Sequence, residues 1–236
     1  PGAHMELLDS TGNTIATWVS TTEPYVVRGK LLPGETYTLK ETAAPDGYLV
    51  TSAFTFTLDS NLTPTVTGTT FGGVEDGVIY MVDAATTVTI SKQAVGGGAE
   101  LPGARLTLTH EGASGTVTDA DFISGNAPRT IERLLVGTVY TLTETTAPNG
   151  YLVAESLQFI IQADGSVLAK RLSEPDSAWQ AVTANTVILK DAPTTVTLSK
   201  RAVGGGAELP GAAVTVTHAE AGSTVTDAQW ISGFDD

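Results

Sequence analysis

The chain has 236 residues, a net charge of −14, no cysteine, and 41% hydrophobic but only 16% charged residues. This length is enough for more than one domain with a core of its own, and so little charge argues against intrinsic disorder. With 12 Lys and Arg residues against 26 Asp and Glu, the chain lacks the positive charge that a nucleic-acid partner requires. The lack of cysteine excludes disulfides and thiolate chemistry, and no apolar run reaches the roughly 20 residues of a membrane span.

Short runs in which threonine alternates with an apolar residue recur along the chain. In chain order they include FTFTL (54–58), TTVTISK (86–92), ARLTLTH (104–110) and TTVTLSK (194–200). A polar residue at every second position is typical of a β-strand with one face toward solvent. Glycine and proline separate the runs at turn-like spacings, and no long stretch has the period of a helix. The sequence therefore predicts an all-β fold.

Three parts of the chain repeat one another in a fixed order of motifs. YTLKETAAPDGYLV (37–50) returns as YTLTETTAPNGYLV (140–153), and TTVTISKQAVGGGAELPGA (86–104) returns as TTVTLSKRAVGGGAELPGA (194–212). Their order predicts three parts, which are a module without its first strand, a complete module, and the opening strands of a third. The predicted boundaries are 1–85, 86–193 and 194–236.

Several predicted strands carry an ionisable residue at the end of a row of apolar residues. Because strand side chains alternate between two faces, each ionisable residue is predicted to share the face that points into the core. An unpaired buried charge is costly, so one interpretation is a buried salt bridge, or strand-end charges that reach solvent. The rows are Val88, Ile90, Lys92; Tyr140, Leu142, Glu144; and Val187, Leu189, Asp191 in the complete module, with Tyr37, Leu39, Glu41; Ile79, Met81, Asp83; and Val196, Leu198, Lys200 in the incomplete ones.

The second interpretation is covalent chemistry among Lys92, Glu144 and Asp191. Burial lowers the pKa of a lysine and raises that of a carboxylic acid. A neutral Lys92 amine would be a nucleophile, and a protonated Glu144 would polarise the carboxyl group of Asp191. Attack on that carboxyl carbon with loss of water would leave an amide between the first and last strands of the module.

Four segments carry a resemblance to a known family: MELLDSTGNTIATW (5–18), ETAAPDGY (41–48), YMVDA (80–84) and SKRAVGGGAELPGA (199–212). They resemble the Cna-B-like (collagen-adhesin B-type) domains of Gram-positive surface adhesins and pilins. They are most similar to a streptococcal fibronectin-binding-protein domain that was split into a tag-and-catcher pair. The resemblance implies tandem β-sandwiches of immunoglobulin-like or prealbumin-like type.

The resemblance also implies roles for the ionisable residues. Lys92 and Asp191 would be the two partners of an isopeptide bond, and Glu144 would be the catalytic acid. Glu41 and Asp83 are the equivalents in the first module, which lacks a lysine strand, and Lys200 is the equivalent in the third. No cofactor is implied.

The function expected from these features is mechanical. The chain would be a stalk repeat of a cell-surface adhesin or pilus, outside the cell and anchored to the wall through a region beyond this sequence. Its partners would be neighbouring modules of the same array. The cross-link would form once and autocatalytically, so no turnover enzyme is expected.

Two other functions remain open from the residues. One is an adhesive module that binds a host matrix protein or glycan, for which the segment Leu172–Val182 is the best candidate surface. The other is a subunit that polymerises head-to-tail, with Lys200 of one copy bonded to Asp83 of another. An unpaired sheet edge accepts an added strand, which is the basis of this alternative.

No metal site is expected from the three histidines. His4, His110 and His218 have no metal-ligand spacing, and the last two occupy equivalent positions of the repeat. The glycine runs at 96–98 and 204–206 lack the continuation of a phosphate-binding loop.

Overall fold

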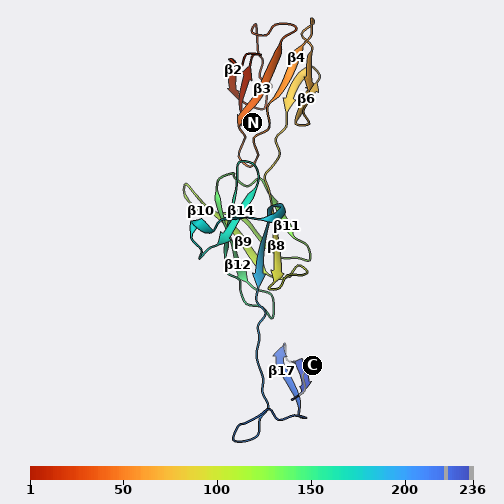
Figure 1. Ribbon diagram of the computed structural model, residues 1–236, viewed down its shortest axis with the longest axis vertical. Coiled ribbons are helices and arrows are strands. Elements are labelled where there is room, and N and C mark those ends of the chain that lie inside the picture. The colour runs from red at the N-terminus through yellow and green to blue at the C-terminus, as the bar shows by residue number, and fades with distance from the viewer. Residues whose placement is uncertain (221–222, 234–236) are drawn as a thin grey trace. The chain divides into compact units, whose positions relative to one another are not determined.

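The computed structural model describes residues 1–220 and 223–233 (Figure 1). The chain divides into two compact units, Pro1–Pro193 and Thr194–Asp236. Within the described residues the regular structure is strand, apart from the short 3₁₀ helices η1 (Asp176–Ala178) and η2 (Thr183–Asn185). The predicted all-β fold is confirmed. No helix in this part of the chain is long and apolar enough to cross a membrane.

Residues 1–85 form one antiparallel sheet and one separate hairpin. The sheet has five strands in the order β2-β1-β3-β4-β5, and its buried apolar residues alternate along each strand as the threonine pattern predicts. Its strands are β1 (His4–Leu8), β2 (Thr14–Val19), β3 (Thr36–Ala43), β4 (Phe54–Leu58) and β5 (Pro64–Thr67); the hairpin is β6 (Gly72–Glu75) and β7 (Val78–Met81).

Residues 86–193 form two sheets whose inner faces share one core. One sheet has the order β10-β9-β12-β13-β14-β15 and the other the order β11-β8-β16. The strands are β8 (Thr87–Ala94), β9 (Arg105–Gly112), β10 (Gly115–Ile123), β11 (Arg129–Glu132), β12 (Val139–Thr146), β13 (Leu157–Ile161), β14 (Val167–Arg171), β15 (Gln180–Ala181) and β16 (Thr186–Asp191).

Strand β8 is the centre of the smaller sheet. It pairs antiparallel with β11 on one side and parallel with β16 on the other. The first and last strands of this part of the chain are therefore direct neighbours, although about a hundred residues separate them. Parallel neighbours need a long connection, and here the six-stranded sheet supplies it.

The absence of a β8-like strand in residues 1–85 explains how this part differs from residues 86–193. The five-stranded sheet corresponds strand by strand to β10-β9-β12-β13-β14, but no sheet in residues 1–85 corresponds to β11-β8-β16. Residues 24–30 form no strand there, and β7 pairs with β6. Without a strand like β8 between them, the segments that correspond to β11 and β16 are not joined into one sheet.

The second unit contains a hairpin of β17 (Ala213–Glu220) and β18 (Ser223–Ile231). The opening strand expected at residues 196–200 is not formed, although the nearly identical residues 88–92 belong to β8. Val196 is 80% exposed, whereas Val88 is fully buried. The difference follows from tertiary context, because β-propensity depends on neighbouring strands.

Thr86, just before β8, makes several hydrogen bonds. It is buried, its N–H donates to the carbonyl of Gly47 (3.0 Å), and its hydroxyl donates to the carbonyl of Leu134 (2.6 Å). Its own carbonyl accepts from the Arg133 N–H (3.0 Å). These contacts satisfy the buried backbone where residues 1–85 meet residues 86–193.

Candidate cross-linking site in residues 86–193

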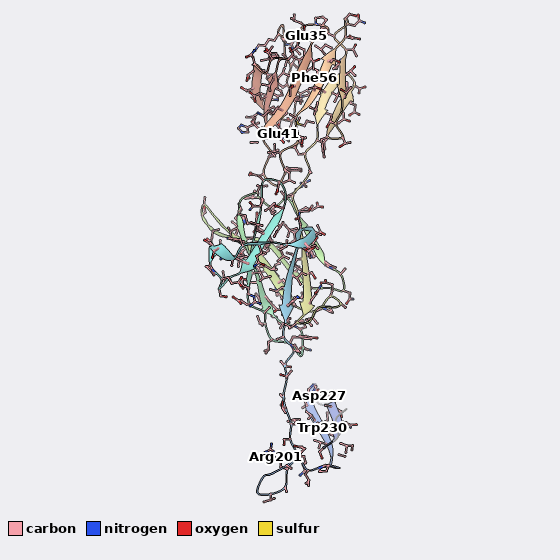
Figure 2. All side chains as sticks on the ribbon, in the orientation of Figure 1. Glu35, Glu41, Phe56, Arg201, Asp227 and Trp230 are labelled. Carbon is pink, nitrogen blue, oxygen red and sulfur yellow. The ribbon has the colours of Figure 1, made fainter. Side chains whose placement is uncertain are left out.

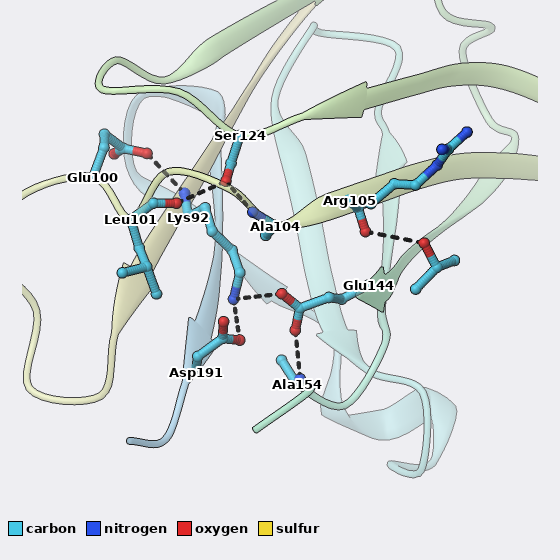
Figure 3. Close-up of polar contacts among 10 residues, drawn as sticks. Lys92, Glu100, Leu101, Ala104, Arg105, Ser124, Glu144, Ala154 and Asp191 are labelled. Carbon is cyan, nitrogen blue, oxygen red and sulfur yellow. Dashed lines mark hydrogen bonds and ion pairs between the residues drawn. The ribbon is translucent and has the colours of Figure 1, made fainter. Parts of the chain in front are cut away.

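Three strands bring Lys92, Glu144 and Asp191 together inside the sandwich (Figure 3). Lys92 lies on β8, Asp191 on the adjacent β16 and Glu144 on β12 of the facing sheet. The Lys92 Nζ contacts Asp191 Oδ1 directly and lies 3.4 Å from Glu144 Oε1. The geometry thus joins the three residues that strand alternation placed on core-facing rows.

Parallel pairing sets the meeting of Lys92 and Asp191. Leu189 lies opposite Lys92 in the ladder, and Asp191 lies opposite Ala94. Asp191 and Leu189 share the core-facing side of β16 because they are two residues apart. The Asp191 carboxyl group therefore lies two residues further along the sheet than the Lys92 backbone, and the long lysine side chain spans this distance.

The site excludes solvent. The exposed fraction is 1% for the Lys92 side chain and 0% for those of Glu144 and Asp191. Two carboxyl groups and one ammonium would leave a net buried negative charge if all were ionised, and such a charge is costly in a medium of low dielectric. A proton on one carboxyl group removes this cost.

Glu144 is the carboxyl group that the site favours for this proton. Burial raises its pKa above the ordinary value, and the hydrogen bond to Asp191 raises it further. The Ala154 N–H, which donates to Oε2 at 2.6 Å, and the charge of Lys92 oppose this shift without reversing it. Among the described residues, Asp191 Oδ2 has no hydrogen-bond partner, and the contact of Glu144 Oε1 is the ion pair with the Lys92 Nζ at 3.4 Å.

This arrangement can carry out one condensation. The Lys92 nitrogen lies against a carboxyl group in a dry interior, and Glu144, whose pKa is raised by burial, lies beside both. Holding reactants in contact converts a bimolecular reaction into a unimolecular one, with effective molarities on the order of 10⁵ M or more.

Residues 1–85 contain the acid pair without the lysine. Glu41 is 3% exposed, and its Oε2 accepts a hydrogen bond from the Thr51 N–H at 2.6 Å, as Glu144 does from Ala154. Its Oε1 is buried, with no hydrogen-bond partner among the described residues. Burial raises the pKa of Glu41. The Thr51 hydroxyl donates to Asp83 Oδ1 at 2.9 Å and holds that side chain near Glu41.

An apolar groove of about 820 Å³ lies beside Glu41 and Asp83. Its floor includes Leu39 and Phe56 of the five-stranded sheet, and Figure 2 labels Glu41 and Phe56 on this sheet. Its walls include residues 20–27 and 77–81. In residues 86–193, β8 occupies the corresponding place: it lies between β11 and β16 in the sheet that shares a core with the larger sheet.

Lys200 belongs to the second unit and is exposed. Its N–H donates to a Glu208 carboxylate oxygen, and its carbonyl accepts from the Leu209 N–H at 2.7 Å. The loop at Glu208 and Leu209 therefore binds the Lys200 backbone, and the Lys200 side chain lies outside any described core.

Sequence reasoning missed two residues that hold the Lys92 backbone, Glu100 and Ser124. Glu100 accepts from the Lys92 N–H, and Ser124 binds the loop next to Glu100. A signal was present in the repeat, because the Glu-Leu-Pro-Gly-Ala and Ile-Ser-Gly segments both recur in residues 194–236.

Two further features of the sequence are the histidines and the segment Leu172–Val182. His110 Nδ1 lies 2.8 Å from Asp119 Oδ2, and the described residues contain no cluster of His, Cys, Asp and Glu fit for a metal. In the segment Leu172–Val182, Asp176 contacts the buried Lys170 Nζ at 3.2 Å, and the Trp179 ring lies 5.3 Å from it. The segment is thus tied to β14.

Three solved structures illustrate what the chain is similar to. The C-terminal fragment of the pilus adhesin SpaC from Lactobacillus rhamnosus GG is 18% identical, with 84% of this chain and 91% of that chain covered and a TM-score of 0.42. The shaft pilin SpaA of the same organism is 14% identical over 84% of this chain and 86% of that one, with a TM-score of 0.34. The Bacillus anthracis TIE protein is 22% identical over 98% of this chain and 38% of that one, with a TM-score of 0.37.

No curated protein sequence matches the chain. A family model does, under the description SpaA, prealbumin-like fold domain, and its matches cover residues 1–70 and 86–174. These matches span more than half of the sequence; the first covers the five-stranded sheet, and the second covers β8 to β14 and ends before β15 and β16. The chain belongs to the family of SpaA prealbumin-like fold domains.

Proposed function

We propose that this chain is a stalk segment of a Gram-positive surface adhesin or pilus, and that an isopeptide bond between Lys92 and Asp191, promoted by Glu144, reinforces it. The observation that carries the proposal is the contact of the Lys92 Nζ with the Asp191 carboxyl group, beside the buried carboxyl group of Glu144, in a core that excludes solvent. Membership of the SpaA prealbumin-like family and the Cna-B-like motifs support the extracellular, wall-anchored location.

The reaction is a condensation without a cofactor. A proton passes from the Lys92 ammonium to the Asp191 carboxylate, which leaves a neutral amine against a neutral acid. The nitrogen attacks the carboxyl carbon while Glu144 hydrogen-bonds to a carboxyl oxygen and stabilises the charge that develops there. The C–O bond breaks, one oxygen leaves as water with two protons, and an amide remains. Because the product stays in the protein, the reaction occurs once per chain.

The bond would stabilise the module by closing a loop. Lys92 and Asp191 are 99 residues apart, and a cross-link over a loop of this length removes unfolded-state entropy worth about 5 kcal/mol. It would also tie the first strand, β8, to the last, β16, so force along the chain could not peel them apart. We place it in an array whose modules are residues 1–85, 86–193 and 194–236.

The test is the intact mass of the denatured protein. Wild type should be short of its sequence mass by one water, whereas Glu144→Ala and Lys92→Ala should have their full masses. Lys190→Ala is the matched control, because Lys190 is exposed on β16 next to Asp191 and should leave the water loss unchanged. A wild-type chain of full mass would refute the isopeptide bond.

A second function is favoured by the groove in residues 1–85: head-to-tail joining of copies. The groove is bordered by the segments that correspond to the neighbours of β8, and its lining includes Glu41, whose buried Oε1 has no hydrogen-bond partner among the described residues. Residues 194–200 repeat the β8 sequence and are exposed. Strand addition by this segment of a second copy would bring Lys200 to Asp83 beside Glu41.

The test of joining is a denaturing gel of the concentrated chain. A ladder that disappears in Lys200→Ala and in Asp83→Ala, and persists in Lys190→Ala, would support it. Wild-type protein that stays at the monomer position would refute it. A second water lost without a ladder would also do so, because it would show that the groove closes within one copy.

A further inference from the structure

The backbone of Lys92 is held by a loop that the condensation chemistry does not use. β11 pairs with β8 only from Thr87 to Ile90, so no described strand lies beside this edge of β8 beyond Ile90. Residues 100 and 101 take that place. The Lys92 N–H donates to Glu100 Oε2 at 2.8 Å, and the Leu101 N–H donates to the Lys92 carbonyl at 2.7 Å. Two consecutive residues thus satisfy both backbone groups of the lysine.

Glu100 also binds the preceding residue. Its Oε1 accepts a hydrogen bond from the Ser91 hydroxyl at 2.5 Å. The two oxygens of one carboxylate therefore hold Ser91 and Lys92 together at the edge of the sheet. Ser91 and Lys92 lie on opposite faces of β8, and a slip of one residue would point the lysine away from the core.

Ser124 connects this contact to the opposite sheet (Figure 3). Its buried hydroxyl donates to the Leu101 carbonyl at 2.7 Å and accepts from the Ala104 N–H at 2.9 Å. Ser124 follows β10 and Ala104 precedes β9, and β9 pairs with β12, the strand of Glu144. The loop thus links the lysine backbone to the sheet that carries the acid.

The same contacts occur in the second unit without a sandwich around them. The Ser199 hydroxyl donates to Glu208 Oε2 at 2.6 Å, the Lys200 N–H donates to Oε1, and the Leu209 N–H donates to the Lys200 carbonyl. The pKa of Glu208 is lowered, chiefly by the Ser199 hydroxyl and then by the Lys200 N–H, so its carboxylate is a strong acceptor. The arrangement is therefore local and needs no neighbouring strands.

We propose that Glu100 is a positioning residue for the cross-link: with Ser91, Leu101 and Ser124 it forms a clamp that fixes the Lys92 backbone relative to Glu144 and Asp191. This inference rests on the proposed isopeptide bond. A misplacement of about 1 Å can cost on the order of a hundredfold in rate, so loss of the clamp should slow bond formation within folded molecules.

The experiment follows the water loss in full-length chain that is isolated unfolded and unreacted in denaturant and is then refolded, because a chain that is already cross-linked cannot react again. Tryptophan fluorescence reports folding, and aliquots quenched in acid are weighed by mass spectrometry, which gives a rate of bond formation per folded molecule. Glu100→Ala should slow this rate on the order of tenfold to a hundredfold. Glu100→Gln should restore it, because an amide accepts from the Lys92 N–H through its oxygen and donates to the Ser91 hydroxyl through its nitrogen.

Glu111→Ala is the matched control, because Glu111 also accepts from a hydroxyl, that of Thr116 at 2.7 Å, but on the exposed β9–β10 hairpin. A Glu100→Ala chain that bonds at the wild-type rate once folded would overturn the clamp. Failure of Glu100→Gln to rescue would do so as well, since the effect would then come from charge. If Glu100→Ala does not fold, Ser124→Ala decides by the same rate. A wild-type chain that loses no water would instead refute the isopeptide bond itself.

Discussion

Lys92 and Asp191 are 99 residues apart in the sequence, and their side chains meet between the parallel strands β8 and β16. Every strand of the larger sheet lies between them in the chain. The contact therefore forms only when the whole of residues 86–193 has folded, and a bond there would lock the complete sandwich.

The first prediction concerns the stability of the buried triad at neutral pH. Glu144→Ala should prevent the proposed bond but keep the Lys92–Asp191 ion pair, whereas Lys92→Ala leaves two buried carboxyl groups without a cation. Removing one partner of a buried pair costs about 3–5 kcal/mol. We expect the free energy of unfolding in denaturant to fall from wild type to Glu144→Ala and further to Lys92→Ala. Equal stability of the two variants would contradict this order.

The second prediction is a pH dependence of Lys92→Ala. Burial raises the pKa of Glu144 above its ordinary value of 4.5, so the folded state holds a proton that the unfolded state releases. The associated stability is fully present below the unfolded pKa and is lost as the pH rises through the raised folded pKa. Lys92→Ala should therefore melt at a higher temperature in mild acid than at neutral pH. The double variant Lys92→Ala/Glu144→Gln should show much less of this dependence.

The third prediction concerns a buried tyrosine hydroxyl. Tyr140 is fully buried, its ring stacks on Phe159 at 5.3 Å, and its hydroxyl accepts from the Leu135 N–H at 2.7 Å. Tyr140→Phe keeps the ring but leaves the Leu135 N–H without this acceptor, which should cost about 1–3 kcal/mol of unfolding free energy. Tyr80→Phe, on an exposed ring, should change it far less. Similar losses for both would show that the hydroxyl bond contributes nothing.

The fourth prediction separates two glycines of the repeated motif. Gly47 and Gly150 both have positive φ angles, 82° and 86°, so alanine at either costs about 1–2 kcal/mol in backbone strain. A Cβ at Gly47 would also lie 2.7 Å from the Arg133 carbonyl oxygen, whereas among the described residues outside its own chain neighbours none would lie within 4 Å of a Cβ at Gly150. Gly47→Ala should therefore lower the unfolding free energy more than Gly150→Ala does. Equal losses would mean that the Arg133 segment moves aside freely.

Much of the site could be read from the alternation of side chains. Val88, Ile90 and Lys92 were predicted on one face, and all three are buried. This inference succeeds because the direction of a strand side chain depends on its position in the strand and needs no knowledge of the partner strand. The repeat identified the equivalents of these residues in the other modules, and Glu41 is buried as its equivalent Glu144 is.

Pairing and local context could not be read in this way. Residues 88–92 belong to β8 and the nearly identical residues 196–200 form no strand, because a strand requires neighbours that complete its ladder. Glu100 follows the glycine run at 96–98 in the sequence, and only the folded loop brings its carboxylate to the Lys92 N–H. The two motif glycines likewise differ only in what packs on them.

The sequence by itself thus determined the all-β class, the repeat and the residues that face the core, since these follow from the period of a strand and from self-similarity. The tertiary structure decided which strands are neighbours, that Lys92 reaches Asp191 beside Glu144, and that a loop holds the lysine backbone. These depend on contacts between residues far apart in the chain, and no local pattern encodes such distances.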